Sequence, residues 1–186
     1  MRRVPIKIER GGNLPDVCLI TSDVFNDERG WFYELYKETE IKNLGLDLRF
    51  KQINRSLSKK IGTIRGLHLQ EEPFAQGKLV SCIRGSIFDV AVDIRPESET
   101  FGSWVSFQLE GADGSSVWVP EGFAHGFQTL SENTEVLYLT TKEYAPDYES
   151  SIAWDDSDIG IEWPIESPIL SEKDKLAGKL EEIVRE

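Results

Sequence analysis

Two histidines are the side chains of this chain best suited to move protons. They are His68 and His125, the only histidines among 186 residues. His68 lies in the motif Arg-Gly-Leu-His-Leu-Gln (65–70), and Lys78 follows ten residues after it. An imidazole titrates near neutral pH and can take a proton from a carbon that a carbonyl group acidifies, while a nearby ammonium can stabilise the resulting enolate. We therefore expect acid-base chemistry here, with a purely structural strand histidine as the alternative.

The motif around the second histidine bears on metal binding. Residues 120–127 read Pro-Glu-Gly-Phe-Ala-His-Gly-Phe and resemble the second conserved motif of the cupin superfamily. The first cupin motif supplies metal ligands as His-x-His, whereas the matching place here reads His68-Leu69-Gln70. Two histidines with no obvious third or fourth ligand do not make a typical transition-metal site. We expect chemistry by acid and base, with no metal and no other cofactor.

The elements that position these residues are mostly short strands. Apolar or alternating runs predict strands at 17–20, 31–36, 78–84, 86–94, 107–110, 116–119 and 136–141. A turn or bulge is expected at Gly85 and a turn at 111–114. Helices are expected at 38–44 and at 173–184, the second with Ser171 as its N-cap. The pattern favours a mainly β fold, a sandwich or barrel of jelly-roll type with a few short helices, in one domain over residues 1–186. The resemblance of residues 120–127 to the cupin motif implies that this is a cupin-type β-jelly roll.

Composition limits the classes of partner and the compartment. The net charge is -12 and the pI is near 4.7, which disfavours binding to nucleic acid or to an anionic membrane. Cys18 and Cys82 each lie in an apolar run, which predicts buried, reduced thiols. We expect no signal peptide, no membrane helix and a cytoplasmic location.

Several motifs, taken together and in order, resemble the dTDP-4-dehydrorhamnose 3,5-epimerase family. The matching segments are 27–30, Gln52, 65–70, 76–80, 88–95, 120–127, 154–156 and 170–174. The resemblance implies that dTDP-4-dehydro-6-deoxy-D-glucose is epimerised at C3 and C5 to dTDP-4-dehydro-L-rhamnose, in dTDP-L-rhamnose biosynthesis. Both carbons flank the C4 ketone, so one site can acidify both protons through the same enolate. The resemblance also implies a homodimer, because family members exchange N-terminal strands.

The same resemblance implies roles for four catalytic residues. His68 matches the base, and Asp174 matches the carboxylate that hydrogen-bonds it. Lys78 matches the residue that stabilises the enolate, and Tyr138 matches the acid that protonates the opposite face. The alternative, purely structural roles are a capping-box carboxylate for Asp174, an exposed strand lysine for Lys78 and a core aromatic for Tyr138. Asp89, in an adjoining strand, is a candidate partner for Lys78.

Substrate-binding residues are carried over in the same way. The positions expected to bind the nucleotide sugar are Arg29, Glu34, Gln52, Asn54, Arg65, His125 and Tyr144. Arginine suits a diphosphate because its planar fork donates two parallel hydrogen bonds. Candidates to pack on the thymine ring are Trp31, Phe32 and Tyr144. His125 is expected to line the pocket without transferring a proton, and the alternative for Arg29 is a turn residue paired with its acidic neighbours.

Departures from the family pattern leave other readings open. Leu69, Ser81, Leu139 and Glu143 differ from the usual residues, and the last three are expected near the pocket. The rivals are a monoepimerase acting on a related nucleotide-linked 4-keto-6-deoxy sugar, a non-catalytic sugar-nucleotide binding protein, and a metal-dependent cupin. The joint presence of a base, an acid and an enolate stabiliser argues against a simple binding protein.

Overall fold

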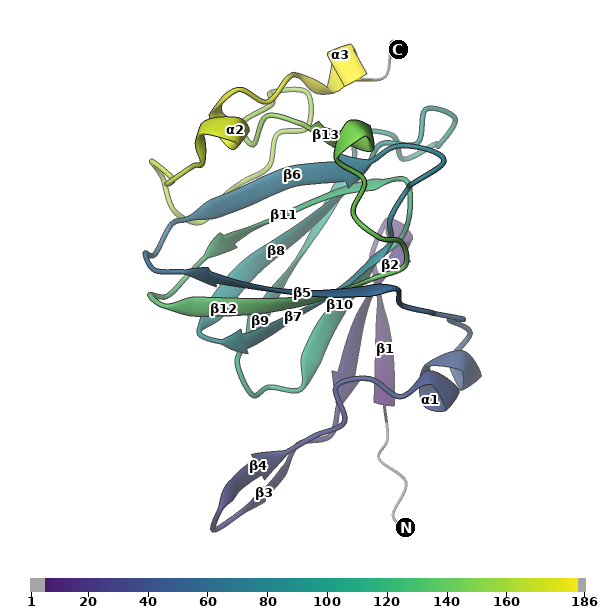
Figure 1. Ribbon diagram of the computed structural model, residues 1–186, viewed down its shortest axis with the longest axis vertical. Helices are drawn as coiled ribbons and strands as arrows, with labels where there is room; N and C mark the ends of the chain where they lie inside the picture. The colour runs from purple at the N-terminus through teal and green to yellow at the C-terminus, as the bar shows by residue number, and fades with distance from the viewer. Residues whose placement is uncertain (1–5, 184–186) are drawn as a thin grey trace.

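The computed structural model describes residues 6–183 and is built on two facing β-sheets (Figure 1). The six-stranded sheet runs in the order β1 (Ile6–Gly11), β2 (Leu14–Ser22), β10 (Ser115–Val119), β7 (Lys78–Arg84), β12 (Thr134–Thr140) and β5 (Gln52–Ser58). The five-stranded sheet runs β13 (Glu149–Ser151), β6 (Ile64–Gln70), β11 (Phe123–Thr129), β8 (Ser86–Asp93) and β9 (Trp104–Glu110). A separate hairpin of β3 (Phe25–Asp27) and β4 (Gly30–Phe32) projects away from both sheets (Figure 1).

The mainly β jelly-roll prediction is confirmed. All pairings between named strands are antiparallel, and the turn predicted at Gly85 joins β7 to β8 with a φ of 81°. A side chain at Gly85 is disfavoured both by this positive φ and by space, because a Cβ there would lie 2.5 Å from the Ser131 hydroxyl. The aromatic run predicted as a strand over 31–36 is a strand only as far as Phe32.

The space between the large sheets is filled by apolar side chains that face inward from both. They are Leu14, Val17, Val80, Cys82, Ile87, Ala91, Leu109, Val117, Val119, Phe123, Phe127 and Val136. Each is at most 3% exposed. Burying one Val, Leu, Ile or Phe side chain contributes roughly 1.5–3 kcal/mol. This layer therefore holds the two sheets at a fixed separation.

The outer face of the six-stranded sheet forms a second core with α1 (Glu38–Asn43), the first predicted helix. Leu79 and Leu139 pack there, and the Ser81 hydroxyl lies 2.6 Å from that of Ser116. Side chains alternate along a strand, and Val80 and Cys82 point inward, so Ser81 points outward. The expectation that Ser81 and Leu139 lie near the pocket is therefore wrong. Both predicted free, buried cysteines are confirmed.

The C-terminal segment covers the outer face of the five-stranded sheet and corrects the second helix prediction. Two short helices, α2 (Glu172–Lys175) and α3 (Leu180–Ile183), replace one long helix; Val184 lies outside the described residues. Between them the chain pairs with Ile152 at Gly178, and the Leu180 amide donates to Asp156. These long-range bonds interrupt a helix that local pattern favours. Ser171 is the N-cap of α2, as predicted.

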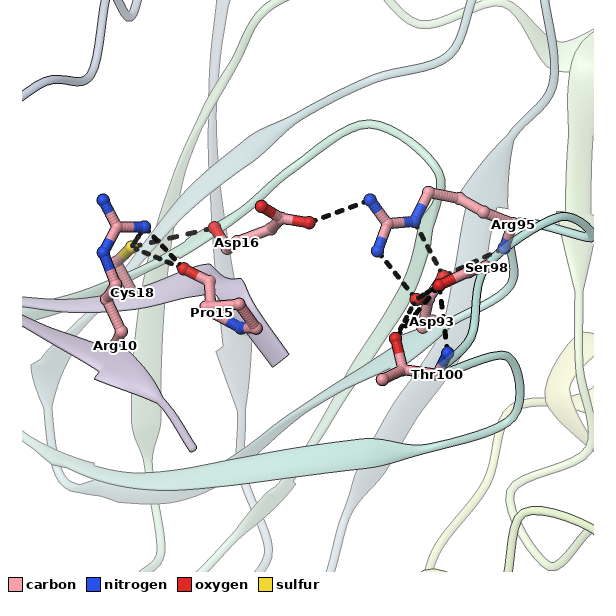
Figure 2. Close-up of polar contacts among 8 residues, drawn as sticks. All are labelled: Arg10, Pro15, Asp16, Cys18, Asp93, Arg95, Ser98 and Thr100. Atoms are coloured by element: carbon pink, nitrogen blue, oxygen red, sulfur yellow. Dashed lines mark hydrogen bonds and ion pairs between the residues drawn. The ribbon is translucent and has the colours of Figure 1, made fainter. Parts of the chain in front are cut away.

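A buried carboxylate fastens the loop that follows β8 (Figure 2). Asp93 accepts hydrogen bonds from the Arg95 guanidinium and from the hydroxyls of Ser98 and Thr100. Burial alone would raise the pKa of Asp93, but these bonds outweigh it and hold that pKa well below its usual range. Arg95 also bonds Asp16 at 2.9 Å, which ties the loop to β2. None of the residues of this cluster lines the cavity described next.

Within the described residues, no helix is long and apolar enough to cross a membrane.

Candidate active site

A cavity of about 480 Å³ is lined by residues from both large sheets and from the C-terminal segment. Its walls include all four residues predicted to be catalytic: His68, Lys78, Tyr138 and Asp174. They come from β6, β7, β12 and α2, so the sequence brings them together only when the barrel closes and the C-terminal segment docks. The volume is in the range of small-molecule sites.

His68 and Asp174 form a hydrogen-bonded pair. The His68 Nε2 lies 2.6 Å from Asp174 Oδ1, and the Ser171 hydroxyl donates to the other carboxylate oxygen at 2.7 Å. Burial raises the pKa of Asp174, but the bonds from His68 and Ser171 outweigh it and lower that pKa. The backbone amide of Asp174 is itself capped by Ser171. Asp174 therefore contacts both the base and the start of α2: its carboxylate bonds His68 and the Ser171 hydroxyl, and its backbone amide donates to Ser171.

Lys78 places its ammonium inside the cavity, where it donates to the backbone carbonyl of His68 at 3.2 Å. Burial lowers the pKa of Lys78 to about 8, against the opposing charges of Glu149 and Asp89. The exposed-lysine alternative is thus wrong.

The predicted contact between Lys78 and Asp89 is also wrong, because Asp89 has another partner. Its Oδ2 lies 2.8 Å from Nε2 of His125 on the adjacent strand β11. The side chains of His125 and Asp89 are 4% and 0% exposed. The second oxygen, Oδ1, is buried and has no hydrogen-bond partner in the described part of the chain. Asp89 acts on Lys78 through charge at a distance.

Tyr138 is nearly enclosed and is held by one hydroxyl. Its Oη lies 2.9 Å from Oγ of Ser56 on the neighbouring strand β5. Burial raises the pKa of Tyr138 to about 12, although the Ser56 bond and the charge of Arg65 lower it. The phenol is therefore protonated at neutral pH. His68 and Tyr138 come from opposite sheets, which suits removal of a proton on one side of a substrate and its return on the other.

The predicted substrate-binding residues fall into two groups. Asn54, Arg65, His125 and Tyr144 line the cavity. Gln52 lies behind this wall, where its side chain donates to Asn54 at 2.8 Å and accepts from the Tyr144 amide at 2.9 Å. Arg65 is aimed by bonds to the Ser58 hydroxyl and the Leu57 carbonyl.

Arg29 and Glu34 lie away from this cavity. Arg29 is in the turn between β3 and β4 and forms an ion pair with Asp27 at 2.5 Å. This agrees with the alternative prediction of a turn residue paired with its acidic neighbours. Glu34 pairs with Lys37. Trp31 and Phe32 are on the same projecting hairpin and are 53% and 64% exposed. The structure thus collects Arg29, Trp31 and Phe32 on one protruding hairpin, and Glu34 follows it in the chain.

Glu149, Ser56 and Lys173 are among the cavity residues that the sequence did not predict. Glu149 accepts from the Tyr144 hydroxyl at 2.6 Å and forms an ion pair with Lys173. Burial raises the pKa of Glu149, but Lys173 and Tyr144 outweigh it and lower that pKa. Ser56 carried a usable signal, because Gln52, Asn54 and Ser56 place three polar side chains on one face of a strand. Lys173 directly precedes Asp174, whereas nothing local marks Glu149.

The cavity is basic within an acidic chain. Arg65, Lys78 and Lys173 line it together, against the single carboxylate of Glu149 and the paired Asp174. This local excess of positive charge suits an anionic ligand such as a diphosphate. Among the described residues, no three His, Cys, Asp or Glu side chains are grouped to hold a metal ion.

Comparison with known proteins agrees with this geometry. Residues 12–182 match the family model for dTDP-4-dehydrorhamnose 3,5-epimerase. The chain is 51% identical over 171 residues to the dTDP-4-dehydrorhamnose 3,5-epimerase of Salmonella typhimurium, covering 91% of this chain and 93% of the relative.

Two crystal structures are similar over nearly their whole length. The dTDP-4-dehydrorhamnose 3,5-epimerase of Bacillus anthracis, with TDP and PPi bound, is 40% identical with a TM-score of 0.91, covering 94% of this chain and 99% of that one. The dTDP-6-deoxy-D-glucose-3,5-epimerase of Legionella pneumophila, in complex with dTDP-4-keto-L-rhamnose, is 41% identical with a TM-score of 0.90, covering 95% and 94%. This chain therefore belongs to the dTDP-4-dehydrorhamnose 3,5-epimerase family.

Proposed function

We propose that this chain epimerises dTDP-4-dehydro-6-deoxy-D-glucose at C3 and C5, giving dTDP-4-dehydro-L-rhamnose for dTDP-L-rhamnose biosynthesis. The observation that carries the proposal is the pairing of a histidine base on one sheet with a buried, protonated tyrosine on the other, with a lysine ammonium in the same cavity. The family membership and the basic cavity support the same reaction.

In the first step, His68 takes the proton from the carbon next to the C4 ketone. Its Nε2 is occupied by Asp174, so Nδ1 is the ring nitrogen left to act. The Asp174 carboxylate fixes the ring and stabilises the imidazolium that forms. The electron pair of the broken C–H bond moves to O4, where the Lys78 ammonium stabilises the enolate.

In the second step, Tyr138 returns a proton to the opposite face of the same carbon. The electron pair moves back from O4, a new C–H bond forms, and the configuration is inverted. His68 is left protonated and Tyr138 is left as a phenolate, so both must exchange with water before the second carbon reacts. Ser56, bonded to the Tyr138 hydroxyl, stabilises the phenolate between the two events.

The rest of the substrate is held by the other cavity residues. The Arg65 guanidinium, already aimed by Ser58 and Leu57, binds the diphosphate, and Asn54 and His125 bind at its flanks. Tyr144 stacks on the thymine ring from the cavity mouth, where it is 53% exposed. The reaction takes place in the cytoplasm, in keeping with two free, buried thiols.

A homodimer completes the site. The hairpin that carries Arg29, Trp31 and Phe32 projects from the barrel with its aromatic side chains exposed, and a second copy would receive these residues at its own cavity (Figure 1). Mixing subunits tests this. Arg29→Ala and His68→Ala subunits are each expected to be impaired, and a mixed dimer regains activity because one of its two sites is unaltered. Mixtures that stay as inactive as either variant would refute the shared site.

The test of the reaction is NMR of dTDP-4-dehydro-6-deoxyglucose incubated with the protein in D₂O, with His68→Ala beside it. Deuterium entering at C3 and C5 only with the unaltered protein supports the double epimerase. Deuterium at a single carbon would mean a monoepimerase. Deuterium at neither carbon, with the nucleotide sugar bound, would mean a non-catalytic binding protein.

A further inference from the structure

Gln70 has a role that the reaction scheme does not use. It occupies the place of the second histidine in the cupin His-x-His pattern, two residues after His68 on β6. Its side chain is buried, with the residue 7% exposed. Nε2 donates to the backbone carbonyls of Phe74 at 2.8 Å and Glu143 at 3.3 Å, and Oε1 accepts from the Ala145 amide at 2.8 Å. One side chain thus fastens two loops that contribute residues to the cavity lining.

Two of the three bonds of Gln70 are to the residues on either side of Tyr144. Gln70 holds the carbonyl before this residue and the amide after it, while Gln52 accepts the Tyr144 amide itself at 2.9 Å. The Tyr144 hydroxyl is fixed in turn by Glu149 at 2.6 Å. The ring is still 53% exposed. An aromatic side chain that lies largely in solvent is therefore held at both ends.

Such fixation has a physical consequence for ligand binding. A loop tyrosine that is free to move loses conformational freedom when it stacks on a ring, and this loss weakens binding. A ring already held in place loses less. Packing does not explain why so many hydrogen bonds hold this exposed side chain. Tyr144 lines the cavity and belongs to none of the three hydrophobic cores.

We propose that Gln70 is a positioning residue that holds Tyr144 ready to stack on the base of the nucleotide, and so sets the affinity for the nucleoside diphosphate without taking part in proton transfer. The proposal rests on the proposed function only in taking a thymidine nucleotide as the ligand.

The test is Gln70→Glu, which keeps the size and one acceptor oxygen but turns the donor into an oxygen facing two carbonyls. We expect the Kd for dTDP, measured by calorimetry, to rise about tenfold, with KM rising in parallel and kcat within about twofold. Tyr144→Ala should weaken dTDP binding at least as much. The double variant should bind no worse than Tyr144→Ala, because both changes remove the same contribution. Gln70→Met, which carries no charge, serves where Gln70→Glu does not fold.

The chain offers a matched control in Gln128. This glutamine is 0% exposed and fastens another loop, donating to the Ile165 carbonyl at 2.8 Å and accepting its amide at 2.9 Å. Gln128→Glu should lower the Tm as Gln70→Glu does and leave the Kd for dTDP unchanged. A purely structural role for Gln70 would make the two variants alike in both measurements.

Three outcomes overturn the proposal. One is a loss of kcat in Gln70→Glu with unchanged Kd and KM, and another is a double variant whose effects multiply. The third is an unaltered protein that does not bind dTDP. Failure of the proposed function looks different: the protein binds dTDP but does not exchange substrate hydrogen, and the Gln70 and Tyr144 comparison still decides the role of Gln70.

Discussion

The two histidines make the same contact in two different environments. Each gives its Nε2 to an aspartate, and they are directly paired across β6 and β11. The His68 side chain is 29% exposed and its aspartate comes from the distant helix α2. The His125 side chain is 4% exposed and its aspartate comes from the adjacent strand. The accessible pair can exchange protons with substrate and water, whereas the enclosed pair is a fixed part of the barrel wall.

The largest difference is expected from removing each imidazole. His68→Ala should lower kcat about 10³- to 10⁴-fold, because it removes the general base, while leaving dTDP binding nearly unchanged. His125→Ala should instead act mainly on dTDP binding and stability, since it leaves Asp89 buried without its partner. Steady-state kinetics, dTDP calorimetry and thermal unfolding of both variants check this. Equal losses of kcat in His68→Ala and His125→Ala would contradict the assignment of proton transfer to the His68–Asp174 pair alone.

The aspartate of the accessible pair gives the next largest effect. Asp174→Asn should lower kcat about 100-fold, because the amide cannot stabilise the imidazolium. It should also lower the free energy of unfolding by about 1 kcal/mol, because the carboxylate bonds to His68 and the Ser171 hydroxyl are weakened. The pKa of Asp174 is lowered in the fold. Its contribution to stability is complete above the unfolded value of about 3.9 and is lost as pH falls towards the folded value. The free energies of unfolding of Asp174→Asn and of the unaltered protein, measured with denaturant, should therefore become equal in acid. An unchanged kcat in Asp174→Asn would mean that Asp174 serves only the start of α2.

The pH dependence of kcat reports on Lys78. Burial lowers the pKa of Lys78 to about 8, so the ammonium that stabilises the enolate is lost as pH rises through that value. We expect kcat to fall about tenfold per pH unit above pH 8 and the Lys78→Arg variant, if active, to lack this decline. A flat profile from pH 7 to 10 in the unaltered protein would contradict an essential ammonium.

The smallest effect on rate is expected from the enclosed aspartate. Asp89→Asn should lower kcat less than about fivefold near pH 7, since Asp89 is fully buried and does not line the cavity. The charge of Asp89 raises the pKa of Lys78, so its removal should shift the alkaline decline of kcat to lower pH. We also expect the free energy of unfolding to fall by about 1–3 kcal/mol. If the pH profile of Asp89→Asn were identical to that of the unaltered protein, the His125–Asp89 pair would have no influence on Lys78.

Local pattern predicted the parts of the fold in which neighbours along the chain decide the outcome. The strands around Lys78 and Tyr138 follow from their short, largely apolar runs, and the turn at Gly85 follows from one glycine. The helix predicted over 173–184 failed because its middle pairs with Ile152, a contact that no local pattern encodes. Tertiary bonding outweighed helix propensity there.

The same division applies to the site. The resemblance located His68, Lys78, Tyr138 and Asp174, and all four line one cavity. Glu149 was missed because its ion pair with Lys173 joins distant segments. The partner of Asp89 was wrong because strand adjacency favours His125 over Lys78. The side chains that share one face of a strand can be predicted from the sequence. Contacts between strands depend on which strands are neighbours in the sheet, and local pattern does not give this.

The double use of Asp174 links the chemical cycle to the docking of the C-terminal segment. The carboxylate that stabilises the histidine also belongs to the first turn of α2, so any opening of that helix withdraws it from the ring. When His68 accepts a proton from the substrate, the hydrogen bond between a neutral imidazole and the Asp174 carboxylate becomes an ion pair, and α2 is held more firmly. Linkage makes this relation reciprocal. Local opening of the segment, seen as hydrogen exchange in α2, should therefore slow while the enolate is present and resume once the proton has left.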